Sequence, residues 1–172
     1  MKKIIRNGTI VTASDTYQAD VLIENEKIAA IGHNLDAEGA EVIDARGLYV
    51  IPGGIDPHTH LDMPFGGTVT SDDFESGTIA AAHGGTTTLI DFCLTEKGVP
   101  LKNSIQTWHD KSDGKAVIDY GFHLMIGEIN ESVLNELPQV IEEEGITSFK
   151  VFMAYKHVFQ ADDETLFKTL VT

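Results

Sequence analysis

The sequence predicts an α/β fold in which a small β layer, residues 1–50, precedes four consecutive βα units in residues 51–172. Three observations support this prediction. Short apolar runs separated by turn residues fill the first part. In the second part, apolar strands alternate with helical patterns at intervals of roughly 30 residues. The first of these later strands ends in two histidines, His58 and His60.

Composition narrows the class of protein. The chain has 42% apolar and 23% charged residues, which is ordinary for a soluble globular protein. A formal net charge of −15 argues against a nucleic-acid partner, because phosphate recognition needs clustered Lys and Arg. Cys93 is the single cysteine, which excludes an intrachain disulfide, fits a cytoplasmic location, and predicts a small apolar filler. Arg6 interrupts the first apolar run, so we expect neither a signal peptide nor a membrane partner.

Residues 1–50 show strand-like runs with turn signals between them. Asn7-Gly8 separates two apolar runs and predicts a hairpin there. A second turn is expected at residues 24–26, and the run at 41–44 ends at Arg46-Gly47. We therefore predict a small antiparallel β-sandwich layer. It lacks clustered His, Asp or Cys, so its predicted role is structural.

Residues 51–172 follow a strand–helix rhythm. The helix after the His58/His60 strand is expected to start at Thr70 or Ser71 and to end before Gly84-Gly85. The remaining predicted elements are a strand at 86–92, a helix at 101–111, a strand at 116–126, a helix at 131–144 split by Pro138, a strand at 147–153 and a helix from Asp162 or Asp163.

Four βα units are half of a TIM-like (β/α)8 barrel, which takes about 250 residues. A half barrel leaves two sheet edges uncovered, so we expect the chain to be the front part of a longer protein. A flavodoxin-like open sheet would explain the pattern without truncation. The last helix reaches Thr172 without a cap, which counts against that alternative.

His58 and His60 are candidate metal ligands. Side chains alternate along a strand, so both imidazoles point to the same side while Thr59 points away. Two neutral imidazoles at a strand end can hold a metal ion, although a hydrogen-bonded histidine pair is an alternative. An apolar run precedes the pair and a loop rich in Gly and Pro follows it, which is typical of a catalytic strand end.

Lys150 lies inside an apolar strand, where a lysine is unusual. One explanation is that its amine extends from the strand end to water. The functional explanation is that burial disfavours a charged amine, and a neutral amine can capture carbon dioxide as a carbamate. Such a carbamate has two oxygens that can bridge two metal ions. Because strand ends of a barrel converge at one face, His58, His60 and Lys150 are expected to meet there.

Two segments, residues 52–62 and 148–155, resemble the cyclic amidohydrolases of the binuclear-metal amidohydrolase superfamily, and most closely the hydantoinases and dihydropyrimidinases. The resemblance implies that His58 and His60 bind the first of two divalent metal ions, usually zinc. It implies that carboxylated Lys150 bridges both ions and that Tyr155 hydrogen-bonds the substrate carbonyl. It also implies a homotetramer, with two further histidine ligands and a catalytic aspartate beyond Thr172.

The expected reaction is therefore hydrolysis of a small cyclic amide. Dihydroorotases carry an arginine at the position of Asp62, where it holds the substrate's carboxylate. An acidic residue would repel that group, so a hydantoin or 5,6-dihydropyrimidine is the expected substrate and N-carbamoyl amino acids the products. Four residues are expected either to form an apolar wall for the ring substituent or to pack in the core, namely Met63, Phe65, Phe152 and Phe159.

Two other functions remain open from the sequence. One is an allantoinase-like cyclic amidohydrolase, and the other is a non-catalytic relative that keeps the fold for assembly. The presence of His58, His60 and Lys150 together argues against the second. The other histidines in helices or strands, His83, His109 and His123, are predicted to be structural or exposed.

Overall fold

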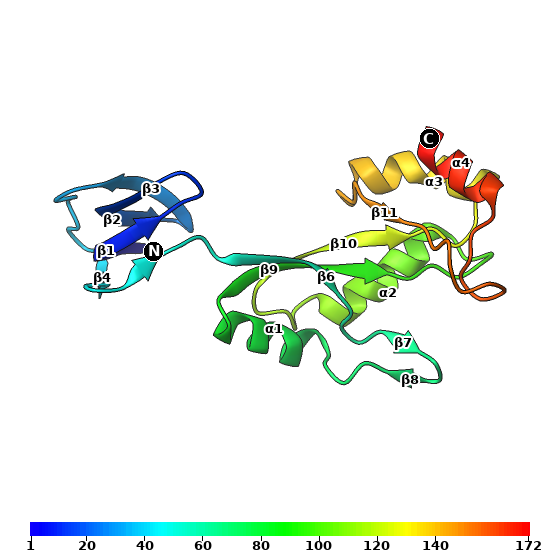
Figure 1. The fold of residues 1–172 in the computed structure, drawn as a ribbon, viewed down its shortest axis with the longest axis horizontal. Helices are drawn as coiled ribbons and strands as arrows, with labels where there is room; N and C mark the ends of the chain where they lie inside the picture. Colours follow the sequence, from blue (N-terminus) through cyan, green and yellow to red (C-terminus); the bar gives the residue numbers. More distant parts are fainter. The chain divides into compact units, whose positions relative to one another are not determined.

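The computed structural model describes all 172 residues and divides into two compact units, Met1–Pro52 and Gly53–Thr172 (Figure 1). Each unit has its own cluster of buried apolar side chains. None of the helices combines the length and the apolar character needed to cross a membrane.

The first unit is a five-stranded sheet with strand order β3-β2-β1-β4, in which β5 also pairs with β1. β1, β2 and β3 are antiparallel, but β4 and β5 pair with β1 in parallel. The prediction of a purely antiparallel layer is therefore wrong, because strand direction depends on how the chain returns after β3. The strands are β1 (Lys2–Val11), β2 (Thr16–Glu24), β3 (Lys27–Gly32), β4 (Glu41–Asp44) and β5 (Tyr49–Val50).

The predicted hairpin at Asn7-Gly8 is also wrong. β1 continues through this dipeptide, with a register shift against β2 between Ile5 and Gly8. Asn7 has a φ of 63°, so its left-handed conformation forms a bulge instead of a turn. Glycine is needed beside it because a Cβ at Gly8 would lie 2.5 Å from a methyl carbon of Val50. The predicted turn at residues 24–26 is confirmed and joins β2 to β3.

The second unit alternates strands and helices around a four-stranded parallel sheet of order β11-β10-β9-β6. This arrangement confirms the α/β class predicted from the sequence. The sheet strands are β6 (Gly54–Thr59), β9 (Thr86–Cys93), β10 (Asp119–Met125) and β11 (Phe149–Lys150), the helices are α1 (Phe74–His83), α2 (Leu101–Ser112), α3 (Glu131–Glu142) and α4 (Asp163–Val171), and β7 (Pro64–Phe65) and β8 (Thr68–Val69) form a hairpin.

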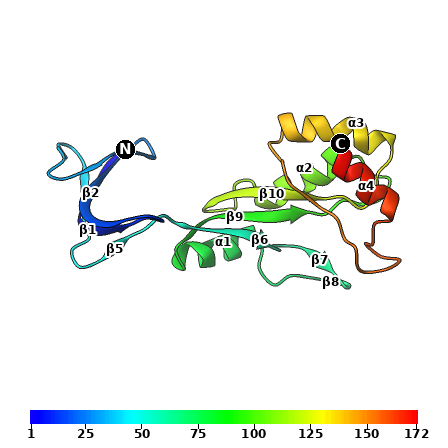
Figure 2. The same cartoon turned by 45° about the horizontal axis from the view of Figure 1, so that its top comes forward.

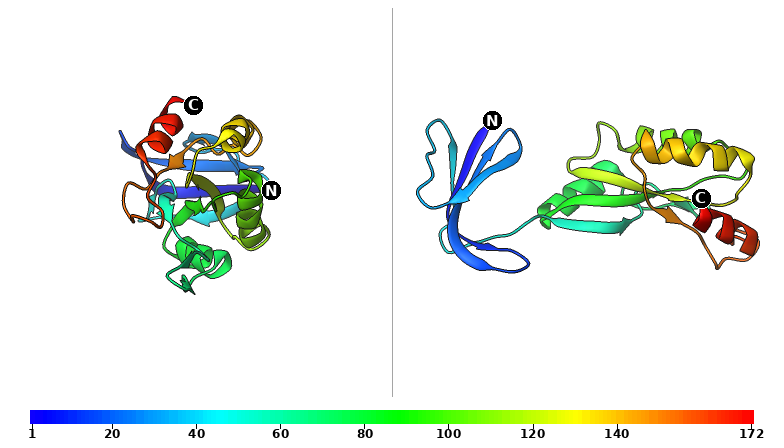
Figure 3. Two further views of the ribbon diagram at one scale, coloured as in Figure 1. Left: turned by 90° about the vertical axis from the view of Figure 1, so that its right-hand side faces the viewer. Right: turned by 90° about the horizontal axis from the view of Figure 1, so that it is seen from above.

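The core of this unit lies between the sheet and its helices. Strand residues such as Leu89 and Leu124 pack against Ile105 and Trp108 of α2 and Leu137 of α3. Helices α1, α2 and α3 follow one another around the outside of the sheet (Figure 3). The β7–β8 hairpin and the loop after β11 lie at the carboxyl ends of the strands (Figure 2). That end of the sheet is where the predicted metal ligands lie.

Three predictions about these elements are wrong: the cap of α1, the split of α3 and the length of the last strand. Asp73, not Thr70 or Ser71, caps α1, because its carboxylate accepts from the Ser76 N–H at 2.8 Å and Ser76 Oγ accepts in return. Helix α3 continues through Pro138 without splitting, and Pro138 is exposed, so water can hydrate the carbonyl left unpaired.

The strand predicted at 147–153 is reduced to Phe149–Lys150. Beyond Lys150 the chain leaves the sheet, and Tyr155 and His157 both take left-handed conformations, with φ values of 61° and 68°. The backbone polar groups there bond within the loop, as when the Ala161 N–H donates to the Phe152 carbonyl at 2.9 Å. A loop closed on itself therefore replaces the predicted end of the strand.

Candidate active site

A cavity of about 320 Å³ opens at the carboxyl ends of the parallel strands. This volume is within the range of small-ligand pockets. All eight residues predicted for the site line the cavity, together with Leu94 and Met125. The predicted residues are His58, His60, Met63, Phe65, Lys150, Phe152, Tyr155 and Phe159.

The side chains of His58, His60 and Lys150 all contact the ring of Phe92, which lies on β9. The centroids of the His58 and His60 rings lie 4.7 and 5.0 Å from its centroid. The Lys150 Nζ lies 4.2 Å from the same centroid. Residues from the two edge strands of the sheet therefore meet over one buried aromatic ring.

The two histidines project to one side of β6, as the alternation of the strand predicts. Their ring centroids are 5.1 Å apart and the rings are nearly perpendicular, at 88°. His60 Nδ1 is buried and has no hydrogen-bond partner. Burial, and then the charge of Lys150, hold the pKa of His60 below its usual value, which favours the neutral imidazole that binds metals.

Asp91, fully buried on β9, fixes the end of the histidine strand. Its Oδ2 accepts hydrogen bonds from the Leu61 N–H at 2.7 Å and from Thr59 Oγ1 at 3.0 Å, on either side of His60. Burial raises the pKa of Asp91 against the opposing effect of these donors. Asp91 therefore fixes the residues on both sides of His60, and the His60 ring itself faces the cavity.

Lys150 lies in the cavity with its amine over two aromatic faces, Phe92 at 4.2 Å and Phe152 at 4.6 Å. None of the ion pairs in the chain involves this lysine. The chain gathers no group of three or more His, Cys, Asp or Glu side chains that could hold a metal ion. The candidate donors from this chain are therefore two imidazoles and the Lys150 amine.

The apolar side of the cavity is built from two loops. Phe65, from β7, stacks against Phe159 at a centroid distance of 6.4 Å, and Phe152 lies 5.7 Å from Phe159. Tyr155 meets Phe152 edge-on at 5.4 Å and is 53% exposed. Three of the four predicted wall residues, Phe65, Phe152 and Phe159, thus contact one another at the cavity and are not part of the buried core.

Comparisons with known proteins identify the family of this chain. Residues 41–109 match the family model described as the amidohydrolase family. A D-hydantoinase from Geobacillus stearothermophilus is 78% identical over 99% of the chain, and a dihydropyrimidinase from Rattus norvegicus is 38% identical over 95% of it. The chain belongs to the hydantoinase and dihydropyrimidinase family. It spans 36% and 33% of the lengths of these two relatives.

Solved structures of hydantoinase-family proteins share the fold of this chain. A crystal structure of a D-hydantoinase superposes with a TM-score of 0.97 at 75% identity, over 99% of this chain and 37% of that one. A dihydropyrimidinase from Brevibacillus agri gives a TM-score of 0.97 at 71% identity, with the same coverage. The likeness extends over both units of the chain, since 99% of it is covered.

Asp62 does not take the place in this hydantoinase-family chain that its charge suggested. Asp62 was expected to repel a substrate carboxylate, but it does not line the cavity. Its carboxylate lies 3.8 Å from Lys111 Nζ, which also donates to the Asp62 carbonyl at 2.5 Å. The chain therefore differs from the dihydroorotase pattern at this position because it lacks a cation that faces the cavity, and not because a carboxylate repels the substrate.

Lys111 fastens the loop that carries Met63 and Phe65 to helix α2. Asp62 has a φ of 49°, an uncommon conformation for a residue other than glycine, and the Lys111 bond stabilises it.

We expect Lys111→Met to lower the free energy of unfolding by about 1.5 kcal/mol, as for a hydrogen bond with one charged partner. It should also raise the KM for a ring substrate while kcat changes little. Lys102→Met, on the exposed side of α2, is the matched control in denaturant titrations and kinetics. Equal stability and equal KM for Lys111→Met and the control would contradict this assignment.

Three further residues at this site, Asp91, Phe92 and His123, were not predicted from the sequence as part of it. Asp91 and His123 each lie between apolar residues of a strand, as Lys150 does. A polar residue inside each of three successive strands was the available signal. His123, predicted to be structural or exposed, lies tilted against Phe92, with the ring centroids 4.7 Å apart.

Proposed function

We propose that the full-length protein containing this chain hydrolyses the cyclic amide bond of hydantoins or 5,6-dihydropyrimidines and releases N-carbamoyl amino acids. The single observation that carries the proposal is the meeting of His58, His60 and Lys150 over the Phe92 ring. The names of the relatives, D-hydantoinase and dihydropyrimidinase, support it.

The donor set fits a pair of divalent metal ions, and we propose that these ions are zinc. His60 has a buried nitrogen without a partner, and His58 faces the same cavity. The Lys150 amine lines the same cavity, over the Phe92 ring, and forms no ion pair with a carboxylate. Attack of the neutral amine on carbon dioxide forms an N–C bond and releases a proton, giving a carbamate that would complete the set. The chemistry that two such ions supply is a hydroxide nucleophile at neutral pH and polarisation of the ring carbonyl.

The other cavity residues bind and orient the substrate. The phenol of Tyr155 donates a hydrogen bond to the ring carbonyl and to the negative charge that develops on it. Met63, Phe65, Phe152 and Phe159 receive the ring substituent and exclude water from it. An apolar wall of this kind favours a hydantoin with an apolar substituent over allantoin, whose ureido group would lose hydrogen bonds to water.

We also infer the surroundings of this site in the whole protein. The four βα units form the first half of a (β/α)8 barrel, and residues 1–50 form part of a β-sandwich. Two further histidine ligands and a catalytic aspartate come from residues outside this chain. The protein works as a homotetramer in the cytoplasm, without nucleic-acid or membrane partners.

Substrate comparison tests the proposal. Zinc-loaded full-length protein is expected to open the rings of hydantoin and dihydrouracil, with release of the N-carbamoyl product measured by chromatography. Allantoin is expected to react at least about tenfold more slowly, because each poorly solvated polar group costs about 1.4 kcal/mol or more in an apolar pocket. Absence of turnover on all three rings, or a preference for allantoin, would contradict the proposal.

A further inference from the structure

His123 connects the two edge strands of the parallel sheet. It lies on β10, opposite Phe92 of β9 in the strand register, and the two rings are 4.7 Å apart. Its Nε2 lies 2.9 Å from the Pro57 carbonyl oxygen on β6, and its Nδ1 lies 2.5 Å from Ser148 Oγ, just before β11. One side chain on β10 therefore contacts β9, β6 and the residue that precedes β11.

The chemistry of its partners fixes how the ring bonds. A carbonyl oxygen can only accept, so Nε2 must carry a hydrogen and donate it to Pro57. In the neutral ring Nδ1 then accepts from the Ser148 hydroxyl. Both nitrogens are satisfied within the chain, unlike Nδ1 of His60. His123 is therefore occupied as a link between strands.

The Pro57 carbonyl belongs to the peptide group that leads into His58. The nitrogen of that same peptide group donates to Asp56 Oδ1 at 3.1 Å. The peptide plane is thus held at its oxygen by His123 and at its nitrogen by Asp56. Because a peptide group is rigid, holding both ends sets the direction in which the His58 side chain leaves the strand.

At its other end the ring is bonded to Ser148, two residues before Lys150 and on the same face of the strand. The strand there has only two paired residues, so few ladder hydrogen bonds fix its position. The Ser148 contact supplies a further attachment to the strand that carries the Lys150 amine.

We propose that His123 is a positioning residue that sets the spacing between the His58/His60 strand end and Lys150. This inference rests on the proposed function, because the spacing matters only if these residues share a metal centre. Removal of a hydrogen-bond partner that orients metal ligands typically costs about 10- to 100-fold in metal affinity or activity. A loss of that size is expected from removal of the His123 ring.

The experiment measures zinc release from the full-length protein into an excess of a chelator, at a temperature well below unfolding. His123→Ala is expected to release zinc at least about tenfold faster than the unchanged protein. His123→Gln, whose amide nitrogen can reach the place of Nε2, is expected to recover part of that retention. Ser148→Ala removes one bond only and should give a smaller acceleration. If His123→Ala does not fold, the zinc release of His123→Gln and Ser148→Ala tests the inference.

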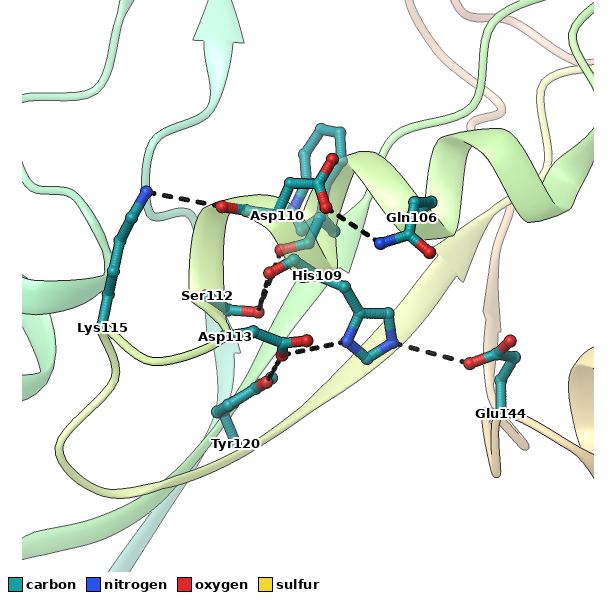
Figure 4. Close-up of polar contacts among 9 residues, drawn as sticks. Gln106, His109, Asp110, Ser112, Asp113, Lys115, Tyr120 and Glu144 are labelled. Atoms are coloured by element: carbon teal, nitrogen blue, oxygen red, sulfur yellow. Dashed lines mark hydrogen bonds and ion pairs between the residues drawn. The ribbon is translucent and has the colours of Figure 1, made fainter.

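His109→Ala is the matched control, because His109 also joins two segments but lies on the helix side of the sheet. Its Nδ1 lies 3.2 Å from Asp113 Oδ1 and its Nε2 lies 3.6 Å from Glu144 Oε2 (Figure 4). Its ring packs edge-on against Phe122, the strand neighbour of His123 that faces the core. Loss of these contacts should lower the melting temperature and leave zinc release unchanged.

Steady-state kinetics add a second measurement. The His123 variants should lower kcat for hydantoin more than they change KM, because the apolar wall that binds the ring is intact. Zinc release and kcat equal to those of the His109→Ala control would overturn the inference while the proposed function stands. Failure of the unchanged protein to bind zinc, or to open either hydantoin or dihydrouracil, would instead remove the proposed function, and with it this inference.

Discussion

Replacement of Lys150 by alanine in the full-length protein is expected to reduce bound metal from two ions per chain to less than one. His58, His60 and the two further histidines proposed outside this chain would remain, but without the bridging group each ion keeps too few ligands to be held tightly. Turnover of hydantoin should fall by more than the roughly 10- to 100-fold that loss of an orienting hydrogen bond costs. Elemental analysis of extensively dialysed protein measures the first effect, and product release measures the second.

The structure supplies a matched control for this variant. Lys156 lies on the loop that follows β11, is exposed, and does not line the cavity. Lys156→Ala should keep both metal ions and normal turnover. Two metal ions per chain in Lys150→Ala would rule out the bridging role.

A chemical rescue can separate a carbamate from a simple amine. Removal of the Lys150 side chain leaves space over the Phe92 and Phe152 rings, where the amine now lies. A short-chain carboxylate such as formate or acetate fits such a space and offers two oxygens in place of the carbamate. We expect part of the metal binding and turnover of Lys150→Ala to return when these acids are added. Rescue by methylamine and not by carboxylates would indicate that an amine, not a carbamate, acts in the native site.

The parts of the site that were predictable from the sequence are those that depend on strand periodicity. Alternation along β6 places His58 and His60 on one side, and the parallel βα rhythm places Lys150 at the same end of the sheet. Both statements need only the period of a strand and the direction of its neighbours. The meeting of these residues over one cavity follows from them.

The parts that were not predictable depend on contacts between segments distant in the chain. Asn7-Gly8 is a favourable turn dipeptide, but pairing of residues 2–11 with β2, β4 and β5 makes it a bulge. Asp62 is charged, but Lys111, 49 residues later, turns it away from the cavity. Local propensity contributes about 1 kcal/mol at such positions, which long-range packing readily outweighs.

The hydrogen-bond partners of His123 were also not predictable from the sequence, because they lie far from it in the chain. Nothing local to the sequence around residue 123 indicates that its ring reaches Pro57, 66 residues earlier. A histidine in an apolar strand was predicted to be structural, and it is structural in the sense that both ring nitrogens are bonded within the fold. Its place beside the Phe92 ring is what connects it to the candidate metal ligands.

Replacement of Tyr155 by phenylalanine is expected to lower kcat for hydantoin about 100- to 1000-fold with little change in KM. Loss of one preorganised donor to a developing oxyanion typically costs about 2.7–4 kcal/mol of transition-state stabilisation. The variant should fold normally, because the features that hold residue 155 belong to its backbone. The Tyr155 carbonyl accepts from the N–H groups of Val158, Phe159 and Gln160, and phenylalanine keeps all three bonds.

The conformation of Tyr155 strengthens this expectation. A bulky side chain at a φ of 61° is an outlier that costs roughly 1–3 kcal/mol, and such strain concentrates at functional sites. Tyr49→Phe, at an exposed position of β5, is the control for loss of a phenol elsewhere. The hydroxyl should matter mainly after the carbonyl oxygen has gained charge, so the loss must fall on kcat and not on binding. A Tyr155→Phe protein with kcat within twofold of normal would therefore exclude this hydroxyl from the reaction, and a rise in KM alone would reassign it to substrate binding.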